Sequence, residues 1–551
     1  MQVSTQSDAF DYIIIGAGSA GAIVAARLSE RRQASVCVLE AGPTDRHPYL
    51  HVPGGFIKVL ANPKLTWQFA TEPSERTANR PIAFAQGRTL GGSSAVNGLI
   101  YNRGQPMDYD VWAQRGNAGW SYRDVLPYFK LSEGRIGPGD DAVRGRDGPL
   151  KVTDIDWNHP LCDAFVDGVE ALGIPRNQDY NSGRQAGVGY YQRTIFRTRR
   201  VSSARSFLHP AMRSGRIDVR TGAQVTCIRL EKGRAVGVDY VHGRSPGVVH
   251  RLHAACEVIL CAGAINSPKL LQISGIGPSD ALTAADIPIR HELPGVGRNL
   301  QDHYAVRMVA RVRNIDTIND RVKFPRLAWE GLNWLLGRPS VLGLSPSLAH
   351  VFWMSAEGLE QPDLQFTFTP ASYSKGRPGL LDSFPGMTCG VWQHRPESVG
   401  WTRVRSADPF AAPAIQPNYL AAEADRRALL AGIRLARTFL GTAALSPWFD
   451  GEAAPGSAAV TDRDLLDWAY REGSTAYHLV GTCRMGPATD PDAVVDADLR
   501  VHGLRGLRVV DASVMPTVTS GNTNAPTMMI AEKASAMILD DGGDAARADR
   551  S

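Results

Sequence analysis

The hydrophobic positions near the N-terminus predict a strand, a helix and a second strand in quick succession. Tyr12–Ile15 is a short apolar run rich in β-branched residues, as are strands buried on both faces. A helix over Gly21–Glu30 and another buried strand over Val36–Leu39 are expected to follow it. This order is typical of the first unit of a parallel sheet that binds a nucleotide.

Further along the chain, the pattern predicts two helices and a meander that rejoins the first unit. The helices cover Tyr122–Ser132 and His159–Leu172, and Gly173 and Pro175 end the second one. The alternating runs and one further buried strand are Ile217–Val219, Val225–Leu230, Ala235–Tyr240 and Glu257–Leu260. Several cations in Arg197–Pro210 favour a solvated surface for that segment.

From about Tyr304 to Tyr477, strand-like runs alternate with helical ones, which predicts a mostly antiparallel sheet backed by helices. The runs are Val306–Val312, Leu364–Thr369, Met387–Gln393 and Thr402–Val404, and the clearest helices are Arg427–Leu440 and Asp462–Arg471. Pro325–Leu336 is an amphipathic helix, and we interpret its Trp329 and Trp334 as core residues rather than as a dock for lipid or quinone. The predicted fold class is therefore α/β with α+β character.

Length and composition predict a globular protein of several domains. The 551 residues exceed one ordinary core, so two or more domains are expected, one of them discontinuous in sequence. The net charge is only +5, and the 60 Lys and Arg are dispersed among 55 acidic residues, which argues against nucleic-acid binding. The seven cysteines are scattered without a CxxC pair, as reduced thiols are, and we expect no metal site.

The chain shows no targeting signal for a membrane or for secretion. Residues 1–10 lack the basic region followed by an apolar stretch that defines a secretory signal. No segment offers the roughly 18 consecutive apolar residues of a spanning helix. We therefore expect a cytoplasmic protein whose membrane contact is peripheral at most, at the inner membrane face.

The turn after the first strand carries the pattern GxGxxG. Gly16 permits the tight turn, Gly18 lets backbone N–H groups approach a pyrophosphate, and Gly21 lets the helix lie close to the sheet. Ser19 and Ala20 belong to the same turn, and the helix N-terminus faces the phosphates. A bare glycine cluster more often marks an ordinary turn, so the pattern needs its context.

An acidic residue at the end of the second strand supplies that context. Glu40, followed by Ala41, stands roughly 20 residues after the glycines, where a carboxylate accepts hydrogen bonds from a ribose. Because Glu40 would repel a 2′-phosphate, NADP is disfavoured, and FAD and NAD remain.

Two later segments have small residues that would let backbone approach such a dinucleotide. In residues 87–97, GRTLGGSSAVN, adjacent glycines are followed by Ser93 and Ser94, although by itself this pattern is more typical of a tight loop before a helix. In residues 263–277, GAINSPKLLQISGIG, small residues keep side chains away from the ligand, and Ser267 can cap the following helix. Both segments resemble, in order, the signatures of the glucose–methanol–choline (GMC) family of FAD-dependent oxidoreductases. The resemblance spans nearly the whole chain.

The resemblance implies a Rossmann-like FAD-binding domain with non-covalent FAD. Some relatives attach the flavin through a histidine in the first signature, where this chain has Val96. Residues 293–304, LPGVGRNLQDHY, are expected to close the flavin pocket. The other residues implied are Arg88, Gly92, Ser93 and Asn97 along the flavin, Val225 at the adenine, Asp511 and Ala512 by the ribityl chain, and Asn522 and Thr523 nearby.

The same resemblance places a catalytic pair near the C-terminus. Taking a proton from an alcohol requires a base that works near its own pKa, which points to histidine. Of thirteen histidines, His478 matches the family's catalytic histidine in H-x-x-G-T, although a lone histidine is usually a core residue. Asn522 falls where relatives carry a second histidine or an asparagine, and its amide would help to hold an alkoxide. Asn524 could serve instead, or cap a helix that begins near Ala525, whose positive end would face the flavin.

The expected reaction is hydride transfer from an alcohol to FAD. The choline branch carries a carboxylate that faces the ammonium group, but Leu348 is its counterpart here and no acid lies between Gly343 and Trp353, so a neutral primary alcohol is favoured over choline. A quinone-like electron acceptor is expected, with an O2-using oxidase as the alternative. A FAD-containing hydroxynitrile lyase and a non-enzymatic flavoprotein stay open, whereas the two signatures argue against an NAD-dependent enzyme.

The expected domains interleave along the chain. The FAD-binding domain comprises residues 8–158, 197–303 and 478–540, the last of which carries the catalytic pair. The substrate domain comprises residues 159–196 and 304–477. Residues 541–551 are expected to form a disordered tail.

Overall fold

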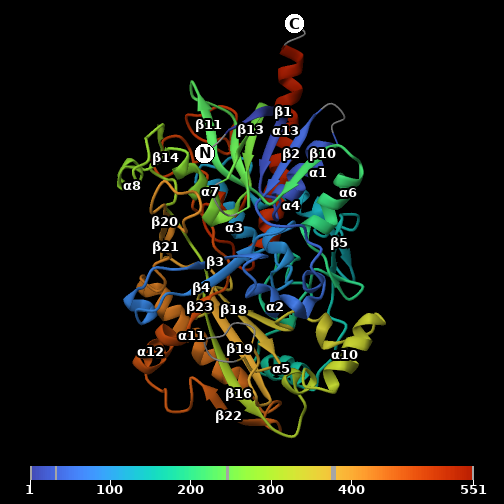
Figure 1. The fold of residues 1–551 in the computed structure, drawn as a ribbon. Coiled ribbons are helices and arrows are strands. Elements are labelled where there is room, and N and C mark those ends of the chain that lie inside the picture. Colours follow the sequence, from blue (N-terminus) through green and yellow to red (C-terminus); the bar gives the residue numbers. More distant parts are fainter. Residues whose placement is uncertain (1–2, 31–33, 244–246, 374–379, 549–551) are drawn as a thin grey trace.

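Two large sheets organise the described residues, which are 3–30, 34–243, 247–373 and 380–548 of the computed structural model (Figure 1). The first sheet has the order β10-β2-β1-β13-β12-β11, and β24 pairs with the end of β13. Its strands are β1 (Val3–Ile15), β2 (Val36–Glu40), β10 (Ile217–Thr221), β11 (Ala223–Glu231), β12 (Arg234–His242), β13 (Val249–Leu260) and β24 (Leu507–Val509).

The predicted strand–helix–strand unit lies at the centre of this sheet. Tyr12–Ile15 pairs in parallel with β2 on one side and β13 on the other. All four of its side chains, which alternate between the two faces of the sheet, are buried, as expected. Helix α1 (Gly21–Ser29) joins β1 to β2. The strand β1 is longer than predicted, because Asp8–Phe10 also pairs with β13.

The predicted meander is confirmed only in part. Strands β11, β12 and β13 form it by antiparallel pairing, but β10 pairs in parallel with β2 at the opposite edge of the sheet. A single residue, Gly222, separates β10 from β11, and its φ of +68° turns the chain. Alternating apolar residues identify a strand but do not identify its partner, which is why the pattern predicted the wrong neighbour for Ile217–Val219.

Helices α1, α6 (His209–Arg213) and α7 (Gly263–Ile273) pack on strands of the first sheet, and α13 (Asn524–Ala548) packs on α1 and on α4 (Tyr122–Ser132). Helix α3 (Pro106–Gln114) packs on α4, and α8 (Ser279–Ala284) follows α7 and β14 in the chain. Arg27 on α1 donates a hydrogen bond of 2.7 Å to Glu532 on α13. Helix α13 projects from the body of the molecule (Figure 1) and reaches Ala548, so residues 541–548 are helical and not the disordered tail that we expected. Residues 549–551 lie outside the described residues.

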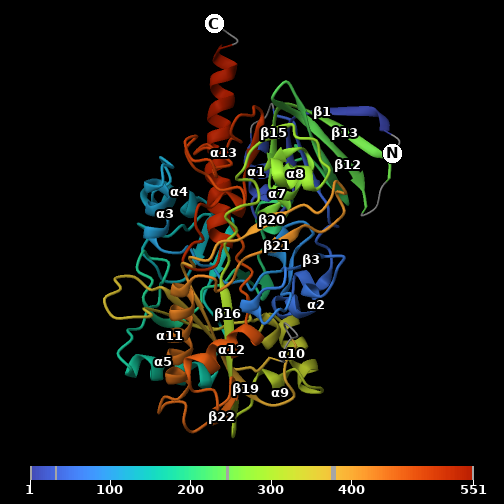
Figure 2. The same ribbon diagram turned by 90° about the vertical axis from the view of Figure 1, so that its left-hand side faces the viewer.

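The second sheet is antiparallel and has the order β22-β16-β19-β18-β17-β7, with β23 paired to β16. Its strands are β7 (Gly187–Tyr190), β16 (Tyr304–Val312), β17 (Ala349–Trp353), β18 (Leu364–Thr369), β19 (Gly386–Gln393), β22 (Phe449–Ala454) and β23 (Ser474–Thr475). Helices α5 (Pro160–Ala171) and α11 (Glu423–Leu440) pack on one face, where Phe165 stacks on Phe368 at 4.2 Å, and α12 (Asp462–Glu472) packs on α11 (Figure 2). The expected antiparallel sheet backed by helices is confirmed.

Small sheets and short helices connect the two large sheets. The predicted strand Thr402–Val404 corresponds to β20 (Trp401–Arg403), which pairs with β21 (Ala414–Gln416) outside the large sheets. The remaining strands are β3 (Thr66–Ala70), β4 (Ala83–Gly87), β5 (Glu133–Ile136), β6 (Leu150–Thr153), β8 (Ile195–Phe196), β9 (Arg199–Arg200), β14 (Ile276–Gly277) and β15 (His291–Glu292), and the remaining α-helices are α2 (Phe56–Leu60), α9 (Ile318–Arg321) and α10 (Arg326–Leu335).

The interpretation of α10 as a helix with its tryptophans in the core is wrong for Trp329. This side chain is 61% exposed and Leu335 is 73% exposed, whereas Glu330 on the opposite face is buried. Glu330 accepts a hydrogen bond from the Val341 N–H and forms an ion pair with Arg321. These polar contacts orient the helix with its carboxylate inward and part of its apolar face outward.

Residues 197–210 are also less exposed than the sequence suggested. Arg200, Ser203 and Phe207 are buried, and Ser203 Oγ donates a hydrogen bond of 3.0 Å to the carbonyl oxygen of Gly18. Small hydroxyl residues allow this segment to pack directly against the glycine-rich turn. The cations at Arg197 and Arg199 stay exposed, so the prediction holds for part of the segment only.

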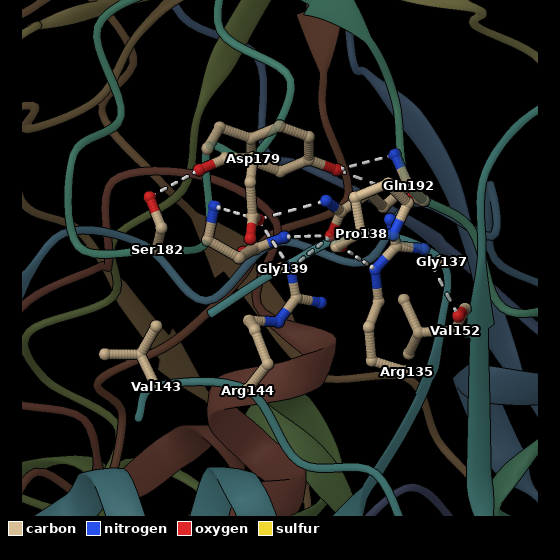
Figure 3. A network of polar contacts seen from close by, with 12 residues as sticks. Arg135, Gly137, Pro138, Gly139, Val143, Arg144, Val152, Asp179, Ser182 and Gln192 are labelled. Carbon is tan, nitrogen blue, oxygen red and sulfur yellow. Dashed lines mark hydrogen bonds and ion pairs between the residues drawn. The ribbon is translucent and has the colours of Figure 1, made fainter. Parts of the chain in front are cut away.

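A buried polar network joins segments predicted to belong to different domains (Figure 3). Arg144 lies in the loop between β5 and β6 and donates hydrogen bonds to Asp179 and to Gln192, the second at 3.0 Å. Gln192 in turn donates to Asp179 at 3.0 Å, and Glu133 forms a second ion pair with Arg144. A buried guanidinium without acceptors is costly. These contacts therefore hold Asp179 and Gln192 against the loop between β5 and β6.

Strands β7 and β16 lie in the second sheet, while β10–β13 and β24 lie in the first. The domain limits themselves stay a prediction. Within the described residues, we find no helix that is both long enough and apolar enough to span a bilayer.

Candidate active site

A cavity of 1190 Å³ lies between the two sheets. One wall comes from the glycine-rich turn after β1, residues 92–97 and the start of α7. The opposite wall comes from one face of β16, β18 and β19. The segments that form the two walls alternate along the chain, so the cavity forms only when both sheets are in place.

The end of the cavity beside β1 is shaped for close approach to the backbone. Gly16 has a φ of +99°, which favours glycine, and a Cβ on Gly21 would lie 1.9 Å from the carbonyl oxygen of Gly16. The N-termini of α1 and α13 converge here, because Ser19 Oγ donates a hydrogen bond of 2.8 Å to Asn524 Oδ1. Two helix N-termini directed at one place favour an anionic ligand.

Glu40 lies at the end of β2 and holds this turn together. Its Oε2 accepts a hydrogen bond of 3.0 Å from the Ala17 N–H, and its Oε1 accepts one of 2.7 Å from the Gly42 N–H. Burial raises the pKa of Glu40 above its usual range. Each carboxylate oxygen keeps a second lone pair, so the group can also accept hydrogen bonds from the hydroxyls of a ribose.

Most of the residues predicted to bind a cofactor line this cavity, together with both members of the predicted catalytic pair. They are Gly16, Gly18, Ser19, Ala20, Glu40, Ala41, Gly92, Ser93, Asn97, Val225, His478, Asp511, Ala512, Asn522 and Thr523. Gly21 and Arg88 are not in the wall. Gly21 packs under the turn, and the Arg88 guanidinium lies 5.0 Å from the ring centre of Trp67, which is itself a wall residue.

Asp511 connects the end of β24 to the start of α7. Its Oδ2 accepts a hydrogen bond of 2.8 Å from the Gly263 N–H and another from Ser267 Oγ. Ser267 was expected to cap the helix, but it lies inside α7, which begins at Gly263. Its hydroxyl nevertheless accepts a hydrogen bond of 3.1 Å from the Ala262 N–H, so it serves the helix start from within.

The predicted pair His478 and Asn522 is in direct contact. Asn522 Nδ2 lies 2.9 Å from Nε2 of His478, and the imidazole is buried except for a surface directed at the cavity. The histidine follows β23 and the asparagine lies two residues before α13, so segments 44 residues apart in the chain meet here. Burial, and then the neighbouring His303, lower the pKa of His478 well below its usual range.

The hydrogen bonds around His303 assign the tautomer of His478. Nε2 of His303 lies 2.8 Å from the carbonyl oxygen of His394, and a carbonyl only accepts, so this nitrogen carries the proton. Burial lowers the pKa of His303 to about 4, so the ring is neutral and its Nδ1 is an acceptor. His478 Nδ1, at 2.9 Å, must therefore be the donor. Nε2 of His478 is therefore unprotonated, and its lone pair accepts the hydrogen bond that Asn522 Nδ2 donates.

A carboxylate below the imidazole fixes the backbone of this segment. Asp302 Oδ1 accepts a hydrogen bond of 2.8 Å from the His478 N–H, while Oδ2 accepts from Thr475 and Tyr419. Burial raises the pKa of Asp302 to about 6. Tyr477 has a φ of +66°, which a bulky residue rarely adopts, and such strain concentrates at functional sites.

Sequence reasoning missed three residues of this site. Asp302 and His303 belong to the QDH of residues 301–303, which was expected only to close the pocket. Trp392 on β19 lies with its ring centre 5.9 Å from that of His478 and lines the cavity. The signal that could have found the first two is an acid next to a histidine at the end of the family-like segment 293–304. Alternation along β19 gave no comparable signal for Trp392.

Comparison with known proteins identifies the fold family. Family models described as GMC oxidoreductase match residues 10–305 and 396–531. The chain belongs to the GMC oxidoreductase family. The resemblance inferred from residues 87–97 and 263–277 is therefore confirmed.

Individual relatives of this GMC oxidoreductase act on different substrates. It is 39% identical over 544 residues to an oxygen-dependent choline dehydrogenase of Staphylococcus aureus, which covers 97% of this chain and 94% of the relative. A crystal structure of pyridoxine 4-oxidase from Mesorbium loti is 32% identical, with a TM-score of 0.85 over 96% of this chain and 99% of that one. A formate oxidase structure, 24% identical, has a TM-score of 0.90 over 98% and 100% of the two chains and shows the likeness of fold.

Proposed function

We propose that this GMC oxidoreductase oxidises an alcohol to an aldehyde or ketone, with His478 as the base and Asn522 as its hydrogen-bonding partner. Family membership makes the chain an FAD-dependent alcohol oxidoreductase. The observation that supports the residue roles is the contact of 2.9 Å between Asn522 Nδ2 and His478 Nε2, which is unprotonated and accepts this hydrogen bond. This contact lies in the wall of the cavity that also contains the dinucleotide-binding turn.

The residues at the β1 end of the cavity fit FAD. The glycine turn and the two helix N-termini would hold the pyrophosphate, Glu40 the adenosine ribose, and Asp511 and Ala512 the ribityl chain. FAD supplies the acceptor of a hydride when it is bound. Val96, at the position where some relatives attach the flavin, offers no nucleophile, so we propose non-covalent binding.

His478 and Asn522 would act on the substrate hydroxyl together. A substrate hydroxyl would replace the hydrogen bond that Asn522 Nδ2 donates to His478 Nε2, and the lone pair on Nε2 would then take the hydroxyl proton as the substrate's C–H hydride leaves. The Asn522 amide donates a hydrogen bond to the oxygen while negative charge develops there, and it stays neutral throughout. His303 accepts from His478 Nδ1 and keeps the imidazole in the orientation that this step needs.

Choline is the second candidate substrate, favoured by the identity to a choline dehydrogenase. The residue expected to replace that branch's carboxylate, Leu348, is buried away from the cavity, and its neighbours Pro346 and Ser347 form the wall instead. Neither carries a charge to balance an ammonium group. An alcohol without a cationic group therefore fits the cavity better.

For the electron acceptor, we propose a quinone or similar compound, with O2 as the alternative. Anaerobically reduced enzyme should be reoxidised faster by a short-chain ubiquinone than by air-saturated buffer. Faster reoxidation by O2 would make the protein an oxidase.

The proposed reaction is tested by an absorption spectrum of the purified holoenzyme, followed by anaerobic addition of benzyl alcohol, a linear alkanol and choline. We expect a flavin spectrum that bleaches with an alcohol. His478→Ala should keep the yellow colour and reduce the flavin roughly 10²–10⁴-fold more slowly, while the exposed His253→Ala serves as the matched control. Cyanohydrin cleavage without bleaching would instead indicate a lyase, and an undiminished rate in His478→Ala would remove His478 from the role.

A further inference from the structure

Beyond His478, the cavity continues along one face of β16. Ala305, Arg307, Val309 and Arg311 line it, because successive side chains of a strand point to opposite faces. The intervening residues Val306, Met308 and Ala310 are buried on the face that packs against the helices. The cavity wall therefore repeats in layers along the strand, roughly 7 Å apart.

The first layer adjoins the proposed catalytic pair, and the second carries a charge. Ala305 pairs with Trp392, the residue whose ring stands beside His478. In the next layer Arg307 pairs with Gly390, which has no side chain to cover the guanidinium. Thr367 lies on the far side of Gly390, so a hydroxyl also borders this place.

Within the described part of the chain, Arg307 is exposed and forms no ion pair. The carboxylates in the cavity wall away from the dinucleotide end are Asp382 and Glu472, and neither is within ion-pair distance of it. Tyr373 and Tyr477 also face this region, but burial raises the pKa of Tyr373 to about 12 and that of Tyr477 above its usual range, so both phenols stay neutral.

The other arginines of this end add to its positive charge. They are Arg80, Arg311 and Arg471. Arg311, two layers further out, stacks over Phe384 at 3.9 Å from the ring centre, and Arg80 donates hydrogen bonds to the carbonyl oxygens of Tyr470 and Gly473. An arginine that faces a cavity without a partner is a ready site for a carboxylate or another anion, which it can bind through two parallel hydrogen bonds.

We propose that Arg307 determines substrate specificity, and that the physiological substrate is an alcohol with an anionic group at its far end, such as a hydroxy acid. This inference rests on the proposed alcohol oxidation and replaces the neutral alcohol expected from the sequence. The hydroxyl lies at His478 and Asn522 while the anion lies at Arg307, one strand layer beyond Ala305. A cationic substrate such as choline is disfavoured at the same place by repulsion.

The test compares hydroxy acids with alkanols of matched length. Holoenzyme is mixed anaerobically with 6-hydroxyhexanoate or 1-hexanol, and kcat/KM is measured with an artificial acceptor; shorter and longer pairs define the best spacing. We expect a preference for the hydroxy acid of at least about 10-fold, expressed mainly in KM. The preference should weaken as ionic strength rises, whereas the 1-hexanol value should not.

Variants separate charge recognition from structure. Arg307→Gln should bring the acid-to-alkanol ratio close to one, and Arg307→Lys should keep part of it because the charge is retained without the planar fork. Arg338→Gln, at an exposed arginine after α10, is the matched control and should leave the ratio unchanged. Flavin absorbance verifies that each variant is folded and loaded.

Two failures are distinguishable. If alcohols bleach the flavin but the wild-type ratio is one or less, or if Arg307→Gln leaves the ratio unchanged, the specificity role is wrong while the proposed function stands. If no alcohol bleaches the flavin, the proposed function fails and the specificity inference fails with it.

Discussion

His303 Nδ1 lies 2.9 Å from Nδ1 of His478, and both rings are buried. The carbonyl oxygen of His394 behind His303 leaves one consistent direction of donation, from His478 to His303 to His394. The base proposed from the sequence is thus the outer member of a chain of polar groups. The tautomer that leaves its Nε2 unprotonated depends on a residue outside the catalytic pair, His303.

Replacing His303 tests this dependence. His303→Ala removes the acceptor for His478 Nδ1, and we expect the rate of flavin reduction by an alcohol to fall roughly 10-fold or more. His303→Asn can present a carbonyl oxygen in its place and should lose less. Because His303 lowers the pKa of His478, its removal should also move the acid limb of the pH–rate profile upward. Equal losses in both variants with an unmoved profile would indicate a structural role only.

The pH dependence of the wild-type enzyme follows from the same contacts. The reaction requires neutral His478, and its pKa is lowered from 6.5, so protonation needs a lower pH than for an exposed histidine. The rate of flavin reduction should therefore stay level as pH falls through 6.5 and decline only at clearly lower pH. Stopped-flow reduction between pH 5 and 8 measures this. A half-loss at or above pH 6.5 would contradict the assigned environment.

Asn522 should act as a neutral donor, which three substitutions distinguish. Asn522→Ala removes the donor and should slow flavin reduction by about 10², the scale seen when one donor to a developing oxyanion is lost. Asn522→Asp should be slower still, because a carboxylate repels the developing charge. Asn522→His restores a donor and should recover part of the rate. All three should retain flavin absorbance, and an Asp variant as fast as wild type would argue against the role.

The exposure of Trp329 has a thermodynamic consequence. Trp329→Ala should change the free energy of unfolding by no more than about 0.5 kcal/mol, because little of the ring is removed from water. Trp120 is fully buried and donates a hydrogen bond of 2.8 Å to the Ala497 carbonyl, so Trp120→Ala should cost about 3–5 kcal/mol. Urea unfolding of the holoproteins compares the two. Similar losses in both would show that α10 is covered in solution.

Local chemistry made much of the fold predictable. Tyr12–Ile15 had to be buried on both faces, and the helix Tyr122–Ser132 is bounded as its periodicity indicated. The partner of β10 was not predictable, because pairing with β2 depends on residues that are distant in sequence. The orientation of α10 was not predictable either, since it depends on hydrogen bonds that Glu330 makes with the segment after the helix.

Some residues of the candidate site were predictable from the sequence, and others were not. The glycine turn, Glu40 and the pair His478 and Asn522 carry patterns that are visible in one stretch of sequence. His303 has a role only through a partner 175 residues away, and no spacing rule relates the two. Arg307 lies in an alternating strand, but alternation alone does not say which face meets the cavity.

The hydrogen bond between Ser19 and Asn524 spans 505 residues of sequence, and β24 completes the first sheet after nearly the whole chain has been made. The chain must therefore be synthesised at least as far as Asn524 before the dinucleotide site can close. Contacts of such long sequence separation form slowly, and incomplete chains expose surfaces that aggregate. Premature termination anywhere before α13 should yield a colourless product that needs chaperones or is degraded. An incomplete chain would therefore not hold a reactive flavin.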